Sequence, residues 1–357
     1  MVVFMTRIRH LLLAGTLAWP TAYASYDVLD LPAVPSDLAP KSLLYSVSRV
    51  GDRLLATGHH GHIIYSDDNG ETWTQAEVPV RSSILDLHFP RPELGWAVGH
   101  DGVILHSSDG GASWVKQYDG RQYGKDGLAL YQELLQQDPA DEMLQMLVEE
   151  MQFAIEQGAD KPFFGVHFHS DTFGHVAGAY GMFLWTLDGG KTWEHRMHII
   201  ENYGFNHLFD FTELDDGRFF IAGEIGLALV GDLGKQSAVA LSTPWEGSFF
   251  TCITANDGSV IMAGLRGRAY RTVDVGETWT AVEKPPSSSL VDSIVLSDGR
   301  VLLAGQAGDI LLSDDDGISF NKIQLPGVER IYAVAEIDPN TLLIAGPNGI
   351  QRVRFEH

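Results

Sequence analysis

The chain has 357 residues, 45% of them hydrophobic, and carries a formal net charge of −23 at pH 7. So large a negative charge argues against a nucleic-acid ligand, whose affinity depends on neutralised phosphates, and against docking on an anionic lipid surface. The single cysteine, Cys252, cannot form a disulfide within the chain, and the apolar run around it predicts a core residue.

The first 24 residues have the features of a signal peptide. Two arginines and a histidine precede the apolar stretch LLLAGTLAW, and Ala22–Ala24 fits a small-x-small cleavage site. That stretch is too short to span a membrane as a helix, and no other segment is long and apolar enough. We therefore expect 1–24 to be removed, leaving an exported, periplasmic protein that does not itself span a membrane.

From residue 43 onward the chain repeats one short phrase seven times, which reads small-x-Gly-x-x-Gly-x-apolar. The first glycines of these phrases are 41, 79, 45, 41, 41 and 41 residues apart. A recurring spacing of this kind indicates an array of one supersecondary unit, and the long interval holds one unit plus an insertion. The glycines are Gly58, Gly99, Gly178, Gly223, Gly264, Gly305 and Gly346.

Residues 43–77 show the composition of one unit. Four short apolar runs are separated by turns rich in Gly, Asn and Asp, which predicts a four-stranded antiparallel meander. Meanders repeated at about 40 to 50 residues are typical of propeller blades. The predicted fold is therefore all-β, a seven-bladed β-propeller that covers residues 25–357.

A second motif lies between the third and fourth strands of five units. It reads Ser/Thr-x-Asp-x-Gly-x-Thr/Ser-Trp, the Asp box of the bacterial-neuraminidase-type repeat. We expect the Asp to accept backbone N–H bonds, the Gly to supply a positive φ, and the aromatic residue to pack between blades. The fourth unit has lost the motif and the seventh ends before one. The motif residues are Asp68, Gly70, Trp73; Asp109, Gly111, Trp114; Asp188, Gly190, Trp193; Asp274, Gly276, Trp279; and Asp315, Gly317, Phe320.

The seventh unit stops after three strands, and residues 26–31 offer a spare segment. We predict that this N-terminal segment forms the fourth strand of blade seven and closes the ring. Such closure covers two strand edges that are otherwise exposed.

The insertion occupies residues 119–162, between blades two and three. Apolar residues recur at helical spacing after Gly127, and again over 141–157, where Asp141 suits a helix start and Gly158 a helix end. We predict a helical hairpin. Its removal, by deletion of 120–160, is expected to leave the propeller folded but to abolish partner capture.

Propeller geometry predicts which face binds. Links between blades and turns between strands two and three open on one face, so the hairpin should stand beside the Gly-x-x-Gly turns. The second helix also carries three methionines, which suit an adaptable partner surface but equally the buried stripe that a hairpin needs. The candidate partner-binding residues are His59, His60, His100, Asp101, Tyr180, Glu224, Arg266, Met143, Met146 and Met151.

Several histidines invite a metal interpretation. His167 and His169 would share one face of a strand, as two ligands could, but the sequence places no carboxylate or cysteine set beside them. The aspartates at 314–316 lie where the Asp-box turn needs them and lack a full calcium ligand set. We therefore expect no metal site and no cofactor.

The main enzymatic alternative is a glycan-binding or glycan-cleaving propeller, because sialidases share Asp boxes. Their arginine triad and Phe-Arg-Ile-Pro-type motif are not evident in the sequence, and no nucleophile elbow or phosphate-cradling loop appears. A pair of carboxylates that hydrolyses glycosides remains an alternative, since propellers carry carboxylates on both faces.

The repeated wording AVGxxGxIxxSxDGGxTW, over about residues 41–355, resembles the photosystem II stability/assembly factor family. The resemblance implies an exported seven-bladed propeller with Asp boxes that acts as a chaperone-like factor. Photosynthetic members bind an early reaction-centre subunit partly through arginines, whereas relatives in other bacteria are associated with envelope transport. We therefore predict a monomeric, non-catalytic scaffold that binds a membrane-associated protein, and the sequence leaves open whether its host is photosynthetic.

Overall fold

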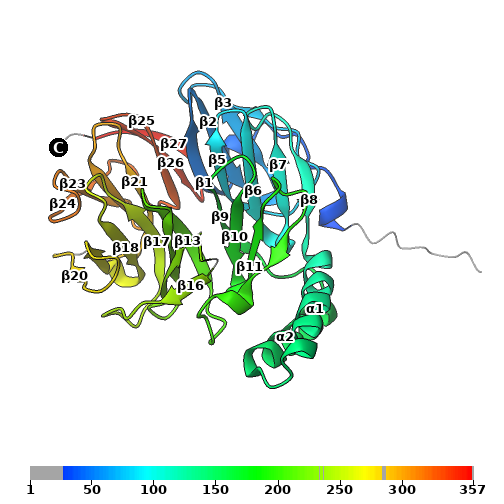
Figure 1. Ribbon diagram of the computed structural model, residues 1–357. Helices are drawn as coiled ribbons and strands as arrows, with labels where there is room; N and C mark the ends of the chain where they lie inside the picture. The colour runs from blue at the N-terminus through cyan, green and yellow to red at the C-terminus, as the bar shows by residue number, and fades with distance from the viewer. Residues whose placement is uncertain (1–26, 233, 236, 284–286, 356–357) are drawn as a thin grey trace, which may run out of the picture.

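The computed structural model describes residues 27–232, 234–235, 237–283 and 287–355, so the expected signal peptide (1–24) lies outside the described residues. These ranges consist mainly of short antiparallel strands, with two α-helices (Figure 1). None of the described helices has the length and apolar character that a membrane crossing requires.

The described strands form seven small sheets, each a meander of strands consecutive in sequence. We number them sheets 1 to 7 in chain order; the first six have four strands and the last has three. Sheets 1 to 3 contain β1 (Leu44–Val50), β2 (Arg53–Gly58), β3 (Ile63–Ser66), β4 (Thr74–Gln75); β5 (Ile84–Arg91), β6 (Leu94–Gly99), β7 (Ile104–Ser107), β8 (Val115–Tyr118); β9 (Phe163–Phe168), β10 (Gly174–Gly178), β11 (Phe183–Thr186) and β12 (Glu194–His195).

Sheets 4 to 7 follow without a further insertion. They contain β13 (Leu208–Glu213), β14 (Arg218–Gly223), β15 (Ala228–Asp232), β16 (Ser237–Ala240); β17 (Phe249–Thr254), β18 (Val260–Gly264), β19 (Ala269–Thr272), β20 (Thr280–Ala281); β21 (Leu290–Val295), β22 (Val301–Gly305), β23 (Asp309–Ser313), β24 (Asn321–Gln324); β25 (Ala333–Asp338), β26 (Thr341–Gly346) and β27 (Gly349–Arg354). Short 3-10 turns are η1 (Val28–Asp30), η2 (Ala39–Lys41), η3 (His59–Gly61), η4 (His100–Gly102), η5 (Ala179–Gly181), η6 (Met197–Ile199) and η7 (Leu265–Gly267).

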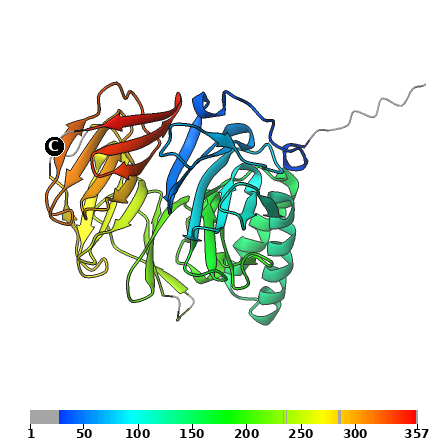
Figure 2. The same cartoon turned by 90° about the horizontal axis from the view of Figure 1, so that it is seen from above.

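The sheets are arranged around a common centre. The first strand of each sheet contacts the first strand of the next, and β1 also contacts β25. Seen from above, the colours run from blue to red around the molecule, so that sheets 1 and 7 lie side by side (Figure 2). This arrangement agrees with the predicted β-propeller.

The Asp-box turns explain how a short motif fixes each outer hairpin. In sheet 1 the Asp68 carboxylate accepts the Thr72 N–H at 2.9 Å and both the Ser66 and Thr72 hydroxyls, while the Gly70 N–H donates to Ser66 Oγ. The same bonds recur around Asp109, Asp188, Asp274 and Asp315. These bonds lower the pKa of Asp68 to about 2, so this turn keeps its acceptor charge at any physiological pH.

The aromatic residue of the motif joins neighbouring sheets. Trp114 of sheet 2 packs in one cluster with Leu55 and Ile63 of sheet 1, and Trp193 of sheet 3 packs in the cluster of Trp96 from sheet 2. Cys252 is buried in sheet 5, as the sequence predicts.

The prediction for the N-terminal segment is wrong. Val28–Asp30 form η1 rather than a strand, and sheet 7 has three strands in the described part of the chain. Leu29 is buried between sheets 1 and 2, and the Arg121 guanidinium binds both Asp27 and Asp30. Buried apolar surface and this ion pair therefore hold the segment beside the start of the hairpin, away from β27.

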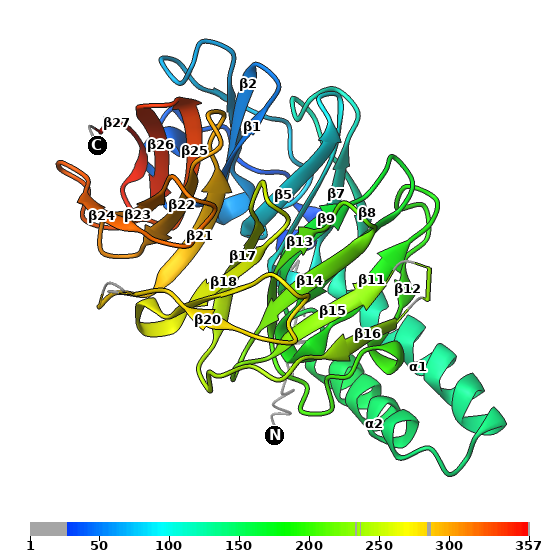
Figure 3. The same ribbon diagram turned by 60° about the vertical axis from the view of Figure 1, so that its left-hand side comes forward.

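Two helices occupy the interval that the sequence predicts to be helical. α1 (Gly120–Gln137) begins at Asp119, which caps it with a full capping box, and α2 (Glu142–Gln157) begins at Asp141, whose side chain accepts the Leu144 N–H. Figure 3 shows the hairpin projecting beside sheet 3.

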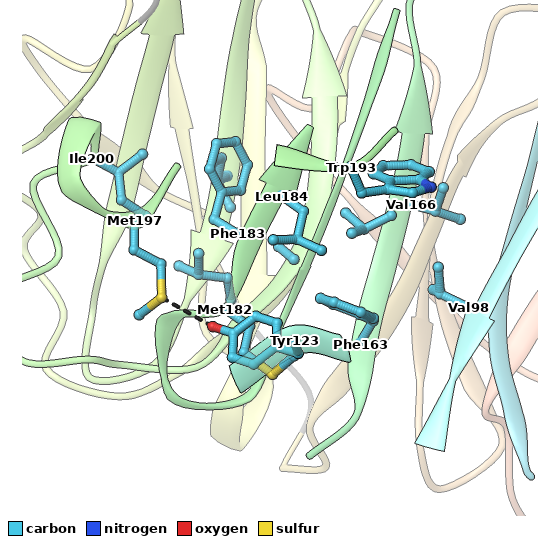
Figure 4. Packing of buried hydrophobic residues seen from close by; sticks show 14 of the residues in the cluster. Val98, Tyr123, Phe163, Val166, Met182, Phe183, Leu184, Trp193, Met197 and Ile200 are labelled. Carbon is cyan, nitrogen blue, oxygen red and sulfur yellow. Dashed lines mark hydrogen bonds between the residues drawn. The ribbon is translucent and has the colours of Figure 1, made fainter. Parts of the chain in front are cut away.

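The hairpin shares a hydrophobic core with sheet 3. Tyr123, Tyr131, Leu147 and Met151 are buried in the same cluster as Phe163 and other residues of that sheet. In Figure 4 Tyr123 lies against Phe163 and Met182, and its hydroxyl donates to the Met197 sulfur at 3.1 Å. The insertion is thus packed into the fold rather than attached to it.

Candidate partner-binding surface

Five of the seven Gly-x-x-Gly turns hold one residue in an unusual backbone conformation. The residue after the first variable position lies in the left-handed region in five turns, which favours Gly, Asn or Asp over bulky side chains. These residues are His60 (φ 58°), Asp101 (φ 60°), Tyr180 (φ 54°), Ile225 (φ 55°) and Arg266 (φ 58°). Four of these side chains are exposed, and that of Asp101 is half-buried.

The structure places most of the candidate binding residues on the surface. His60, His100, Tyr180, Arg266 and Met146 are exposed. His59, Asp101, Glu224 and Met143 are half-buried. Met151 is fully buried against Gly127 and His195, so the prediction that it binds a partner is wrong. Of the three methionines, only Met146 is therefore available to a partner as an exposed side chain.

Tyr180 belongs to a row of aromatic rings that Lys161 links to Phe153 on the hairpin. The Lys161 ammonium lies 5.4 Å from the Phe153 ring of α2 and 5.2 Å from the Tyr180 ring, so it bridges the two by cation–π contacts. The Tyr180 ring lies edge-on to His207 at 5.0 Å, and the Tyr180 N–H donates to His207 Nδ1 at 2.8 Å. Phe153 and Tyr180 are 50% and 52% exposed, which is unusual for large aromatic side chains held in place.

The row continues to the centre of the molecule. His207 contacts Phe164, Phe164 contacts Phe209 at 5.4 Å, and Phe209 contacts Phe250 at 5.4 Å. We call Phe153, Tyr180, His207, Phe164, Phe209 and Phe250 the aromatic track. Phe164, Phe209 and Phe250 of the track line a central cavity of about 360 Å³, together with Tyr45 and Tyr332. The sequence did not predict the track, although each of these three phenylalanines is the second residue of a first strand, a periodicity that the repeat makes visible.

Three aspartates line the same cavity at the third position of a first strand, in sheets 2, 4 and 6. Each carboxylate accepts a backbone N–H from the first strand of the next sheet. The pairs are Asp86 with Val166 (3.0 Å), Asp210 with Cys252 (2.9 Å) and Asp292 with Val334 (2.7 Å).

Burial raises the pKa of all three cavity carboxyls. The pKa of Asp86 rises to about 7 and that of Asp292 to about 8, and the neighbouring charge of Asp210 adds to both shifts. The pKa of Asp210 is also raised by burial. A protonated carboxyl still accepts a backbone N–H, so the contacts between sheets persist in either form.

The histidines singled out in the sequence do come together, and with a carboxylate. His167 and His169 lie beside Glu213 of sheet 4, and the rings of His88 and His175 are within 5.8 Å of His167. Burial lowers the pKa of His88 to about 3 and that of His175 well below its usual value. Sequence reasoning missed Glu213 because it lies in another sheet, 44 residues after His169.

A family model supplies the link to known proteins. The model described as "Photosynthesis system II assembly factor YCF48" matches residues 65–126 and 145–302. The chain belongs to this family. Among curated protein sequences, none matches the chain.

Solved structures share the fold of this YCF48-family chain. The structure "YCF48 bound to D1 peptide" is 16% identical over 92% of this chain and 100% of its own, with a TM-score of 0.62. YCF48 from Cyanidioschyzon merolae is 14% identical over 90% of this chain and 97% of its own, with a TM-score of 0.61. Virginiamycin B lyase from Staphylococcus aureus is 12% identical over 89% and 96%, with a TM-score of 0.65. At these identities the likeness shows the fold alone.

Ile225 gives a first prediction for this family member. A β-branched residue at φ 55° is strained, and its side chain is 63% exposed, so packing does not offset the strain. Replacing it with asparagine is expected to raise the free energy of unfolding by about 1 kcal/mol. Thermal or denaturant unfolding measures this. Leu187→Asn is the matched control, because Leu187 is similarly exposed but is not at positive φ. A destabilised Ile225→Asn protein would contradict the expectation.

Proposed function

We propose that the protein is an exported, non-catalytic scaffold that binds a membrane-associated protein partner, and that the partner docks across the aromatic track. The proposal takes the seven sheets as the blades of a closed propeller and the mature protein as a periplasmic monomer. Membership of the YCF48 family supports a protein-binding role, since one of the solved structures with this fold is YCF48 bound to D1 peptide.

The exposure of the aromatic track carries the proposal. Aromatic residues that are held rigidly, yet remain half exposed, are typical of interaction surfaces, where they supply contact area at a low cost in conformational entropy. Lys161 is buried between the Phe153 and Tyr180 rings, and its ammonium pairs with Glu150. This buried charge therefore already has a partner and needs none from a docked protein. The track runs from the hairpin to the mouth of the cavity, which suits an extended segment of a partner chain.

Substitution of the track tests the proposal. Phe153→Ala combined with Tyr180→Ala is expected to reduce partner capture tenfold or more, because central aromatic residues dominate binding free energy. The matched control is Leu187→Ala, which removes an equally exposed apolar side chain at the other end of β11. The measurement is crosslinking of the tagged mature protein in native envelopes, followed by identification and quantification of the captured protein.

Three outcomes are informative. One membrane protein captured by the native chain and the control, but depleted by the double variant, supports the proposal. Equal capture by the native chain and the double variant would overturn docking across the track. Capture of glycans in place of a protein would favour the alternative of a glycan-binding or sialidase-like propeller.

A further inference from the structure

Two histidines and a glutamate from different sheets converge at the junction of sheets 3 and 4. His167 is the fifth residue of β9, His169 follows two residues later, and Glu213 is the last residue of β13. Because side chains alternate along a strand, the two imidazoles lie on one face, and β13 brings the carboxylate to that face. One donor atom of each residue lies within 4.8 Å of the others.

Both imidazoles contact the Glu213 carboxylate directly, and the His167 contact is a hydrogen bond, so the three donor atoms already share one small space. His167 Nε2 lies 3.2 Å from Glu213 Oε2, and His169 Nδ1 lies 2.9 Å from the same oxygen. Ligands at about 2.0–2.2 Å from a tetrahedral zinc ion lie roughly 3.3 Å from one another. His169 Nδ1 makes no hydrogen bond among the described residues despite its 2.9 Å approach to the carboxylate.

The surroundings of His169 resemble those of a metal ligand in a preformed site. The His169 side chain is 95% buried, and its Nδ1 meets the Glu213 carboxylate at 2.9 Å without hydrogen-bond geometry, so a metal ion between the two would satisfy both groups. Its other nitrogen, Nε2, lies 3.3 Å from His175 Nδ1. A histidine that binds a metal through one nitrogen commonly donates from the other to such an acceptor, which fixes the ring.

Two further histidines, His88 and His175, lie nearby but are not among the proposed ligands. His88 accepts the Phe168 N–H through Nδ1 at 3.2 Å, so that nitrogen is occupied. The aromatic wall of Phe211 and Phe219 encloses His175 on its remaining side. Glu213, in contrast, is 36% exposed in its side chain, so water can reach the point where the three donor atoms converge.

We propose that His167, His169 and Glu213 bind a divalent transition metal ion of the zinc class, with His175 orienting His169 and water completing the coordination. Two histidines and one carboxylate are an established zinc ligand set. The site is distinct from the aromatic track: Phe164 and His167 lie on the same strand, about 10 Å apart along it.

Titration of tag-free, metal-stripped protein with zinc chloride tests the proposal. Calorimetry is expected to give saturable binding of one ion per chain, and cobalt(II) at the same site is expected to give the intense visible absorption of tetrahedral coordination. Glu213→Gln and His167→Ala are each expected to weaken zinc binding about 100-fold. This is at least as large as the usual effect of removing a residue that only orients a metal ligand. The melting temperature of each metal-free variant confirms that it is folded.

The matched control is His59→Ala with His60→Ala, which removes the other group of neighbouring histidine rings. This control is expected to bind zinc as the native chain does. If the control lost zinc binding while Glu213→Gln retained it, the metal would bind at His59 and His60, and the proposal would be overturned. Absence of saturable binding by the native chain would overturn it as well. If His167→Ala does not fold, Glu213→Gln decides alone, since it preserves the shape of the side chain.

Discussion

Replacing Leu147 with alanine is expected to destabilise the whole protein by about 2 to 5 kcal/mol, the usual effect of truncating a buried leucine. Leu147 is fully buried in the core that the hairpin shares with sheet 3. Because the two are packed together, we expect one cooperative unfolding transition at a lower temperature. The neighbouring Met146→Ala is the matched control, since Met146 is 39% exposed and its loss should have little effect.

The same core changes the expectation for deleting residues 120–160. That deletion would expose Phe163, Phe183 and Met197, which the hairpin covers. We expect the shortened chain to be strongly destabilised or to aggregate, so it cannot serve as a clean test of partner capture. A separate early transition in Leu147→Ala, with the rest of the protein unaffected, would show instead that the hairpin is an independent unit.

Replacing Asp86 and Asp292 with asparagine is expected to flatten the pH dependence of stability. The pKa of each carboxyl is raised in the folded protein, to about 7 and about 8, above a usual value near 3.8. Between about pH 4 and pH 8 the folded state therefore binds more protons than the unfolded state, and stability falls as the pH rises. Asparagine stays uncharged and its amide oxygen still accepts the backbone N–H.

We expect the melting temperature of the native chain to fall between pH 5 and pH 9, and that of the double variant to fall less. At pH 9 the variant should be the more stable by on the order of 1 to 3 kcal/mol, less than the full pKa shifts imply because both side chains line the cavity and are only half-buried. Asp314→Asn, an exposed acid, is the control and should leave the slope unchanged. A double variant that loses stability equally at both pH values would contradict this account of the cavity carboxyls.

Much of the fold follows from local chemistry that a sequence displays. The Asp-box turns and the paired glycines act within a few residues, so the positions of the outer hairpins were predictable, and so were two helices with capping aspartates. The N-terminal segment was mispredicted because its position depends on Arg121, about 90 residues away. No local pattern indicates that contact.

The candidate sites divide in the same way. The alternation of a strand predicted that His167 and His169 share a face, and turn chemistry predicted the exposure of Tyr180. Glu213 and Phe153 could not be assigned, because their roles arise where separate sheets and the hairpin meet. Met151 was misassigned because a methionine stripe fits a binding face and a buried face equally well.

The three cavity aspartates also link the sheets in pairs. Sheets 2 and 3, 4 and 5, and 6 and 7 are each joined by one carboxylate, and an odd number of sheets leaves sheet 1 outside this scheme. Every couple consists of consecutive sheets, so each can form as soon as its second member has been synthesised. Sheet 1 emerges first but borders sheet 7, which emerges last. Sheet 1 therefore has both of its flanks covered only after sheet 7 has been synthesised. Until then, its first strand is stabilised only by sheet 2 and by the N-terminal segment.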